Sequence, residues 1–222
     1  MSYAVKEIFY TLQGEGAHSG RPAVFCRFAG CNLWSGREAD RATAVCRFCD
    51  TDFVGTDGPG GGRFADAQAL AEAVAAAWPS REFHGRYVVC TGGEPLLQLD
   101  AAAVAALRER GFDVAVETNA TLPLPPGGVD WVCVSPKAGS EAQWVLREGD
   151  ELKLVYPQPR PGAEPERFAP TQWRFTHYYL QPQDVPGNPE ATQANLRAAT
   201  NYCLANPRFK LSLQTHKLLG IP

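Results

Sequence analysis

The sequence predicts an α/β fold, a partial and modified parallel TIM-like barrel of about six strands with few helices. Short β-branched or aromatic runs alternate with helical patterns, which is typical of right-handed βαβ units and a parallel sheet, either open or curled into a partial barrel. Each predicted strand ends in polar residues or glycine, and sites in parallel α/β folds lie at these strand ends. The chain has 222 residues, whereas a full eight-stranded barrel typically needs roughly 250. We expect a single domain over residues 1–222.

Six apolar runs bounded by turn residues are the predicted strands. They cover residues 23–28, 87–91, 113–117, 131–135, 151–155 and 177–180. Two helical patterns begin at acidic residues suited to N-capping, at 66–78 and 100–110, and weaker helices are predicted at 140–148 and 165–172. A last helix is expected over 189–205, after a series of breakers, and the glycine-rich stretch 55–63 is expected to be a flexible loop.

Composition excludes several classes of protein. The 21 basic and 24 acidic residues give a net charge of -3 without any block of like charge, so no basic footprint for nucleic acid is present. No apolar run approaches the roughly 20 residues of a membrane span, and the first residues do not resemble a signal peptide. We therefore expect a cytoplasmic protein with no nucleic-acid or membrane partner.

Seven cysteines in a reducing compartment predict metal or cluster ligands rather than disulfides. Cys31, Cys46 and Cys49 follow the first predicted strand, and three thiolates can hold three irons of a cubane while one iron stays open. A structural zinc site needs a fourth ligand. Cys26 could supply it, although its strand pattern favours a buried side chain. The remaining cysteines, Cys90, Cys133 and Cys203, are expected to be small buried hydrophobes.

The segments CRFCDT at 46–51 and TGGEP at 91–95 resemble the radical S-adenosylmethionine (SAM) superfamily. In that superfamily, SAM chelates the open iron of a 4Fe–4S cluster, and the GGEP segment lies against its amino group. The first spacer, residues 32–45, is longer than the common pattern of the superfamily. Without the cysteines, GGEP would indicate only a tight turn.

A narrower resemblance is carried by LQGEG at 12–16, RFAGCNL at 27–33, CDT at 49–51 and SLQTHK at 212–217. From about residue 8 to the end, the chain is similar to the 7-carboxy-7-deazaguanine synthase family. The resemblance implies a carbon–nitrogen lyase that contracts the ring of 6-carboxytetrahydropterin with loss of ammonia, in queuosine and 7-deazapurine biosynthesis. It also implies a cluster-binding loop at about 29–63, Mg²⁺, an electron donor such as flavodoxin or ferredoxin, and a homodimer.

The resemblance assigns residues to each ligand. The implied cluster ligands are Cys31, Cys46 and Cys49. The implied Mg²⁺ ligand is Thr51, and Asp52 is an alternative oxygen ligand nearby. The implied SAM-binding residues are Phe48, Cys49, Asp50, Gly92, Gly93, Glu94, Glu117, Asn119, Ser135, Pro136, Lys137, Gln181, Pro182, Gln183 and Asp184. The implied substrate-binding residues are Leu12, Gln13, Gly14, Glu15, Arg27, Thr91, Gln214, His216 and Pro222.

The chemistry of several assigned side chains suits these roles. The planar fork of Arg27 can bind the pterin carboxylate bidentately, but an outward-facing Arg27 would form a surface salt bridge instead. Gln13 and Glu15 can read the amide edge of the pterin. Lone histidines are more often structural than catalytic, and chain ends usually fray. The placement of His216 and of the Pro222 carboxylate in a pocket therefore depends on the resemblance.

Two other functions remain open at this point. An activating radical SAM enzyme would share the three cysteines and Glu94 but would not need Gln13, Glu15 and Arg27. A non-catalytic zinc-binding module would use Cys26 as its fourth ligand. The sequence also leaves open the reductant, the need for Mg²⁺ and the role of residues 55–63.

Overall fold

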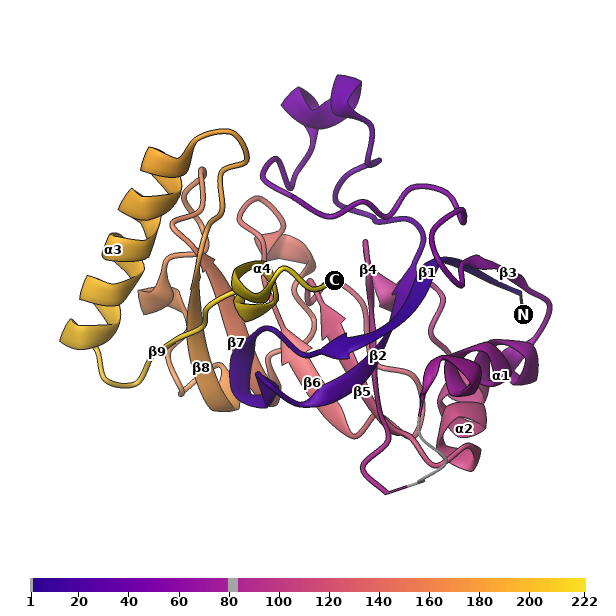
Figure 1. The fold of residues 1–222 in the computed structure, drawn as a ribbon. Helices are drawn as coiled ribbons and strands as arrows, with labels where there is room; N and C mark the ends of the chain where they lie inside the picture. The colour runs from indigo at the N-terminus through magenta and orange to yellow at the C-terminus, as the bar shows by residue number, and fades with distance from the viewer. Residues whose placement is uncertain (1, 80–83) are drawn as a thin grey trace.

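The computed structural model describes residues 2–79 and 84–222, whose strands form one nine-stranded sheet (Figure 1). The strand order is β3-β1-β2-β4-β5-β6-β7-β8-β9. The strands are β1 (Tyr3–Leu12), β2 (Pro22–Phe28), β3 (Gly62–Phe64), β4 (Tyr87–Gly92), β5 (Asp113–Thr118), β6 (Trp131–Val134), β7 (Glu148–Tyr156), β8 (Arg174–Pro182) and β9 (Lys210–Leu211). The helices are α1 (Ala67–Ala77), α2 (Ala101–Glu109), α3 (Pro189–Ala205) and α4 (Thr215–Leu219).

All six predicted strands are confirmed, as β2 and β4 to β8, and each pairs with the next in parallel. The sheet is a partial barrel that does not close, because β3 and β9 remain at its two edges. The prediction missed three strands. Two of them, β1 and β3, extend the sheet by antiparallel pairing beside β2, and β9 is a two-residue strand beside β8.

The apolar pattern of β1 is broken by a bulge, which explains why this strand was missed. Val5 pairs with Phe28 and Glu7 pairs with Arg27, so two steps along β1 match one step along β2. A bulge changes which residues share a face of the sheet. Odd-numbered side chains before Lys6 therefore lie in the core, and those after it line a cavity.

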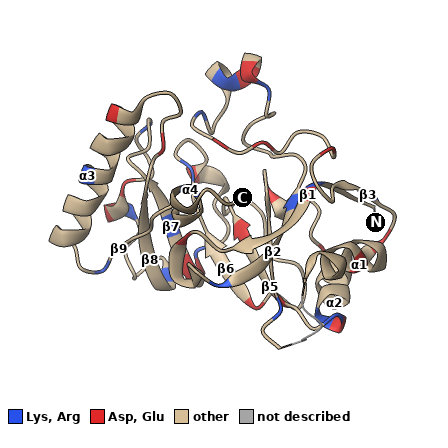
Figure 2. Ribbon diagram, in the orientation of Figure 1, with Lys and Arg blue, Asp and Glu red and all other residues tan. Residues whose placement is uncertain are grey.

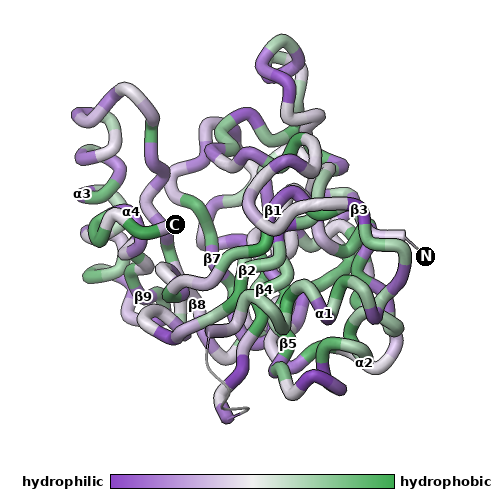
Figure 3. The backbone as a smooth tube through the Cα atoms, turned by 45° about the vertical axis from the view of Figure 1, so that its right-hand side comes forward, coloured by the Kyte–Doolittle hydropathy of each residue, from purple (hydrophilic) through white to green (hydrophobic). Residues whose placement is uncertain are grey.

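The central strands have two buried faces with different chemistry. Leu152, Leu154 and Val116 point to one face and join the main core, whereas Lys153 and Glu117 point to the other face and line the cavity. This alternation follows from the two-residue period of a strand. Figure 3 shows apolar residues concentrated along β2, β4 and β5 and on the adjacent helices α1 and α2.

The three long predicted helices are confirmed. The side chains of Asp66 and Asp100 accept hydrogen bonds from the backbone amides of Ala69 and Ala103, which caps α1 and α2 as expected. These two helices pack against each other and next to the first half of the sheet, and α3 lies beside β8 at the other end (Figure 1).

The weaker helix predictions at 140–148 and 165–172 are wrong. Only single 3₁₀ turns form there, at Glu141–Gln143 and Pro165–Arg167, and β7 already begins at Glu148. Aromatic side chains from these loops pack together instead: the ring centroid of Trp144 lies 5.6 Å from that of Phe168 and 5.5 Å from that of Trp173. Tertiary packing thus outweighs weak local propensity.

The glycine-rich stretch packs against the bulge of β1. The amide of Gly58 donates to the carbonyl of Lys6, and the amide of Ile8 donates to the carbonyl of Pro59. A side chain on Gly61 would place its Cβ 2.1 Å from the Lys6 carbonyl oxygen, so only glycine permits this approach. The expected loop therefore lies along β1, and its last two residues belong to β3.

Charged residues of both signs are spread over the view in Figure 2, including the short helix at Glu38–Thr43 that projects from the molecule. Across residues 2–79 and 84–222, no helix has the length and hydropathy needed to cross a lipid bilayer.

Candidate active site

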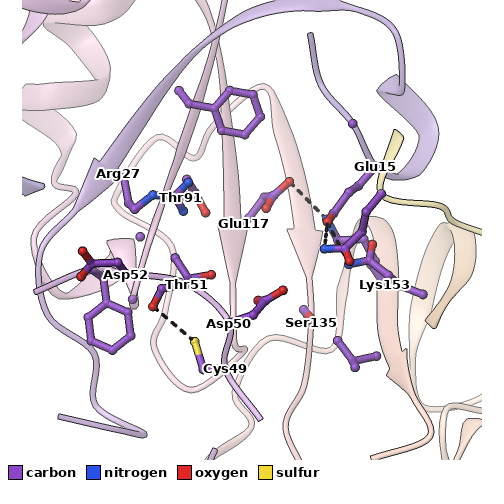
Figure 4. A pocket seen from close by; sticks show the side chains of 18 of the residues that line it. Glu15, Arg27, Cys49, Asp50, Thr51, Asp52, Thr91, Glu117, Ser135 and Lys153 are labelled. Carbon is purple, nitrogen blue, oxygen red and sulfur yellow. Dashed lines mark hydrogen bonds and ion pairs between the residues drawn. The ribbon is translucent and has the colours of Figure 1, made fainter. Parts of the chain in front are cut away.

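A cavity of about 440 Å³ opens on the second face of the sheet, at the carboxyl ends of the parallel strands. Every residue assigned to a ligand in the sequence lines this cavity, apart from Glu94 and Pro136. Figure 4 shows Cys49 and Thr51 on one side of it and Glu15 with Lys153 on the other. We call the first side, residues 31–53, the cysteine wall. We call the second side, formed by Gln13, Glu15, Glu117 and Lys153, the charged wall.

The cysteine wall brings Cys31, Cys46 and Cys49 to one cavity. Cys31 and Cys49 pack against a small apolar cluster that includes Trp34 and Phe53. The Cys46 thiol donates a hydrogen bond to the Cys49 sulfur, which lowers the pKa of Cys49 to about 6. Cys49 therefore favours the thiolate, the form that binds metals, at neutral pH.

The structure excludes Cys26 as a fourth ligand beside these three residues. Cys26 is fully buried in the main core, on the face of the sheet opposite to the cavity. Cys90 and Cys133 are also buried, as predicted, whereas Cys203 is only partly buried. Three thiols without a fourth fit a cluster that leaves one iron open, and they do not fit a closed zinc site. Among residues 2–79 and 84–222, no three His, Cys, Asp or Glu side chains are arranged so that they could bind one metal ion together.

Two glycines at the end of β4 allow the cysteine wall to approach the sheet. A Cβ on Gly92 would lie 2.3 Å from the Phe28 carbonyl oxygen, and Gly92 has a φ of +149°. A Cβ on Gly93 would lie 2.2 Å from the Gly30 carbonyl oxygen and 2.6 Å from the Cβ of Cys31. The glycine pair is therefore required by close packing beneath the cysteine loop.

Glu94 and Pro136 do not reach the cavity. The Glu94 carboxylate is fully buried and accepts hydrogen bonds from the Thr118 hydroxyl at 2.8 Å and the Asn119 amide at 2.8 Å. It also accepts a bond from the Leu96 amide, and burial raises its pKa. The carboxylate thus organises the turn after β4 from behind, and the Pro136 carbonyl accepts a bond from Gln158.

The charged wall is a network of buried polar side chains. The Lys153 ammonium lies 2.6 Å from Glu15 Oε2 and 3.3 Å from Glu117 Oε1. Gln13 Nε2 donates to the same Glu117 oxygen. Although burial opposes ionisation of Glu15, Lys153 and its other partners lower the pKa of Glu15 to about 2. This wall therefore carries charge although its side chains are largely buried.

Arg27 lies inside the cavity and not on the surface. Its Nε donates to Glu7 Oε1 at 2.7 Å, from the neighbouring position on β1. The Arg27 side chain is only 19% exposed, so the surface salt bridge considered from the sequence does not apply. Thr91 lines the same side of the cavity (Figure 4).

Lysine bridges hold the segments around Thr51. The Lys6 ammonium contacts Asp52 at 2.9 Å and Asp57 at 2.8 Å, so the Asp52 carboxylate is already paired. The Lys217 ammonium contacts Asp50 at 2.9 Å and Asp184 at 2.6 Å. These bridges join the cysteine wall to β1 and to the end of β8.

The end of the chain folds over the cavity. His216 packs so closely against Gly14 that a Cβ there would lie 2.1 Å from its Nδ1. The Thr215 amide donates to the Gly14 carbonyl, and the Thr11 hydroxyl donates to a Pro222 backbone oxygen at 2.8 Å. His216 and Pro222 therefore line the cavity, although chain ends usually fray.

Four charged cavity residues were missed from the sequence: Lys6, Glu7, Lys153 and Lys217. The first two lie at the bulge of a strand that the pattern did not predict. The sequence did contain an indication for Lys153, because this lysine lies inside the predicted buried strand 151–155. Buried charges are rare unless they are paired. Lys217 stands at the end of the SLQTHK motif without a spacing that would indicate its partners.

Comparisons with known proteins show the family of this chain. The sequence pattern of the Radical SAM superfamily matches residues 40–155, and the fold and cavity thus define a radical SAM protein. A 7-carboxy-7-deazaguanine synthase from Bordetella pertussis is 60% identical over 222 residues, covering all of both chains. One from Bradyrhizobium diazoefficiens is 61% identical over 221 residues, again covering all of both. The chain belongs to the 7-carboxy-7-deazaguanine synthase family.

The fold also matches a solved structure. The crystal structure of QueE from Escherichia coli aligns with a TM-score of 0.63 and 24% sequence identity, covering 96% of this chain and 94% of that chain. At this identity the match concerns the fold, and it agrees with the open, mostly parallel sheet.

Proposed function

We propose that this chain is a radical SAM lyase that converts 6-carboxytetrahydropterin to 7-carboxy-7-deazaguanine with loss of ammonia, on the route to queuosine and other 7-deazapurines. One observation carries the proposal. A single cavity combines three cysteines on one wall with charged and amide side chains on the other. The first wall suits a radical-generating cofactor, and the second suits a polar heterocycle with a carboxylate.

Cys31, Cys46 and Cys49 would hold a 4Fe–4S cluster, which members of the Radical SAM superfamily use together with SAM. When bound, the cluster and SAM supply a 5′-deoxyadenosyl radical that removes a hydrogen atom from the substrate. Because the glycine pair Gly92–Gly93 packs directly against Phe28, Gly30 and Cys31, its backbone lies beside the cysteine wall, where it would contact the methionine end of SAM. Glu94 supports that turn from the core, so its part in SAM binding would be exerted through the backbone.

Further SAM contacts are proposed around the same end of the cavity. Lys137 Nζ is held by the hydroxyl and carbonyl of Ser135, which orients the ammonium toward a bound carboxylate or hydroxyl. Proposed contacts that also line the cavity are Phe48, Asp50, Asn119, Gln181, Pro182, Gln183 and Asp184. Glu117, assigned to SAM by the resemblance, contacts Lys153 and Gln13 in the charged wall, and we propose that it faces the pterin instead. Pro136, away from the cavity, shapes this turn.

The pterin would lie between Arg27 and the charged wall. Glu7 occupies the Nε of Arg27, so the two terminal nitrogens of the guanidinium are directed to the substrate carboxylate. The segment Leu12–Glu15, Thr91 and Gln214 line the pterin side. His216 and the carboxylate of Pro222 would close the pocket, where they exclude water and accept substrate N–H groups.

Thr51 is proposed to contribute its hydroxyl to Mg²⁺ shared with the substrate, because Mg²⁺ favours oxygen ligands and keeps several waters. Asp52 lies next to it but is paired with Lys6. Thr51 thus suits direct ligation better than its neighbour does.

We further propose a homodimer that receives electrons from flavodoxin or ferredoxin in the cytoplasm. The described cysteines are all free thiols, as a reducing compartment would keep them. Sedimentation of the holoenzyme would show whether two chains associate.

The proposal is tested by anaerobic reconstitution with iron and sulfide, followed by reduction and incubation with SAM, Mg²⁺ and 6-carboxytetrahydropterin. Mass spectrometry should detect 7-carboxy-7-deazaguanine, and omission of Mg²⁺ should slow its formation. SAM cleavage without conversion of the pterin would keep the radical SAM assignment and overturn the substrate. Such a result would favour an activating enzyme, whereas bound zinc without iron would favour a binding module.

A further inference from the structure

The buried Lys153 is the least explained charge in the cavity. It lies on β7, with its side chain only 6% exposed, between carboxylates from two other parts of the chain. Glu15 belongs to the connection between β1 and β2, and Glu117 lies near the end of β5. A buried lysine is costly unless it is paired, so its position calls for a function in this wall.

The contacts of Glu15 show that Lys153 is part of a defined arrangement. Oε2 of Glu15 accepts from Lys153 at 2.6 Å, and Oε1 accepts from the Nε2 atoms of Gln181 at 2.9 Å and Gln214 at 3.0 Å. These donors come from β7, β8 and the segment just before α4. The carboxylate is thus fixed from three directions, and its orientation toward the cavity cannot vary freely.

Glu117 accepts fewer hydrogen bonds than Glu15 and can accept more from a ligand. Its Oε1 accepts from Gln13 at 3.1 Å and from Lys153 at 3.3 Å. In the described part of the chain, no hydrogen bond reaches its Oε2, although Glu117 lines the cavity. A carboxylate oxygen has two acceptor sites, and this one can therefore receive N–H groups from a ligand.

We propose that Lys153 is a positioning residue for substrate recognition: its ammonium holds Glu15 and Glu117 side by side as carboxylates, which accept N–H groups from the aminopyrimidinone edge of the pterin. This inference rests on the proposed function and extends it. Figure 4 shows Glu15, Lys153 and the Glu117 carboxylate on the same side of the cavity, joined by hydrogen bonds.

The charge balance of the wall supports this role. The other titratable groups that face the cluster are Glu151 on β7, Cys133 on β6 and His216 at α4. Burial raises the pKa of Glu151 and of Cys133, which opposes their ionisation. The Lys153 ammonium itself contacts two carboxylates, those of Glu15 and Glu117. The excess negative charge favours a ligand edge rich in donors, such as the amino group and ring N–H of a pterin.

The test measures binding of 6-carboxypterin, a fluorescent oxidised analogue, to the reconstituted holoenzyme at several pH values from about 5.5 to 8. In the unsubstituted protein Glu15 is ionised over this whole range, because its pKa is about 2. We expect K153M to bind the analogue about tenfold or more weakly at the acidic end and to regain affinity toward the alkaline end. Loss of the cation raises the pKa of the buried Glu15 carboxyl toward that range.

Lys210 provides the matched control, because it is exposed on β9 and its substitution K210M also removes one lysine charge. K210M should keep the affinity and the pH profile of the unsubstituted protein. A folded K153M with unchanged affinity and a flat pH profile would overturn the positioning role. A pH-independent loss that is equally large in an E15Q background would overturn it too, since Lys153 would then act without Glu15.

Two further outcomes are distinguishable. If K153M does not fold, the double variant E15Q/K153M removes the Glu15 carboxylate together with Lys153. Its affinity for 6-carboxypterin is then compared with that of E15Q alone. Equal affinities of E15Q and E15Q/K153M would support the inference. If the unsubstituted holoenzyme cleaves SAM but does not bind 6-carboxypterin, the substrate of the proposed function fails, and the role of Lys153 fails with it.

Discussion

The two walls of the cavity differ in how they are built. The cysteine wall is a loop whose residues are close in sequence, and its Cys31 and Cys49 side chains pack with Trp34 and Phe53. The charged wall is assembled from the β1–β2 connection, β5 and β7, and its ion pair joins Glu15 to Lys153 across 138 positions of the chain. The first wall comes from one stretch of the chain, and the second joins stretches that are far apart in the sequence.

This difference indicates a division of labour that substitutions can separate. Substitution of Cys31, Cys46 or Cys49 in the cysteine wall should abolish radical generation while leaving pterin binding intact. Changes on the pterin side should weaken substrate binding while leaving SAM cleavage intact. A substitution that impairs both processes equally would show that the two walls fold as one unit.

The largest effect is expected for Cys49→Ala in the cysteine wall. The pKa of the Cys49 thiol is about 6, so this residue supplies a thiolate at neutral pH. Its loss should prevent stable cluster binding, so the iron content falls and no product forms. Iron analysis and mass spectrometry of the product provide the measurement. Cys203→Ala, in the partly buried face of α3, should retain cluster and activity. Full cluster content in Cys49→Ala would remove Cys49 from the ligand set.

Arg27→Ala should have the next largest effect and should act on the pterin side. A lost charge-assisted hydrogen bond costs about 1.5–3 kcal/mol, which corresponds to a drop in kcat/KM of roughly 10- to 150-fold. SAM cleavage without substrate should be unchanged. The control Arg174→Ala disrupts an exposed pair with Glu148 and should alter neither parameter. Unchanged steady-state kinetics for Arg27→Ala would place the substrate carboxylate elsewhere.

Gly93→Ala should impair the junction where the cysteine wall meets the sheet. The new Cβ would lie 2.2 Å from the Gly30 carbonyl oxygen, so the backbone must shift and SAM should bind more weakly, by about tenfold. Equilibrium binding of SAM to the reconstituted protein measures the effect. Gly62→Ala is the matched control, because its Cβ would meet only Phe64, at 3.9 Å. Equal SAM affinity in both variants would contradict the close-packing argument.

The last and smallest effect in this series, on folding stability, is expected for Glu15→Gln: the loss of stability relative to the unsubstituted protein is fully present near neutral pH and shrinks as the pH falls. The folded-state pKa of Glu15, about 2, lies below the ordinary value of 4.5. A lowered folded pKa stabilises the fold above the unfolded pKa, and this stabilisation is lost as the pH falls from about 4.5 toward 2. Urea titrations across this range should show a shallower decline for Glu15→Gln than for Glu190→Gln, an exposed control on α3. Identical pH profiles would show that the Lys153 pair does not affect acid stability.

Much of the fold could be predicted because its signals are local. The parallel strands are apolar runs with turn residues at their ends, and Asp66 and Asp100 cap the helices that they were expected to cap. The errors have a physical cause. β1 is interrupted by a bulge that the glycine-rich stretch stabilises. In the second half of the chain, the ring of Trp144 packs against that of Trp173, and the helix predicted at 140–148 does not form.

By itself, the sequence determined the parallel α/β class, the cysteine motif and the glycine pair, because these depend on the identity and spacing of neighbouring residues. Only the tertiary structure decided that Cys26 faces the core, that Glu94 turns away from the cavity, and that Lys153 joins Glu15 and Glu117. A one-residue register shift moves a side chain to the other face of a sheet. The partner of a buried charge depends on which distant strands the fold brings together, and no local pattern encodes that choice.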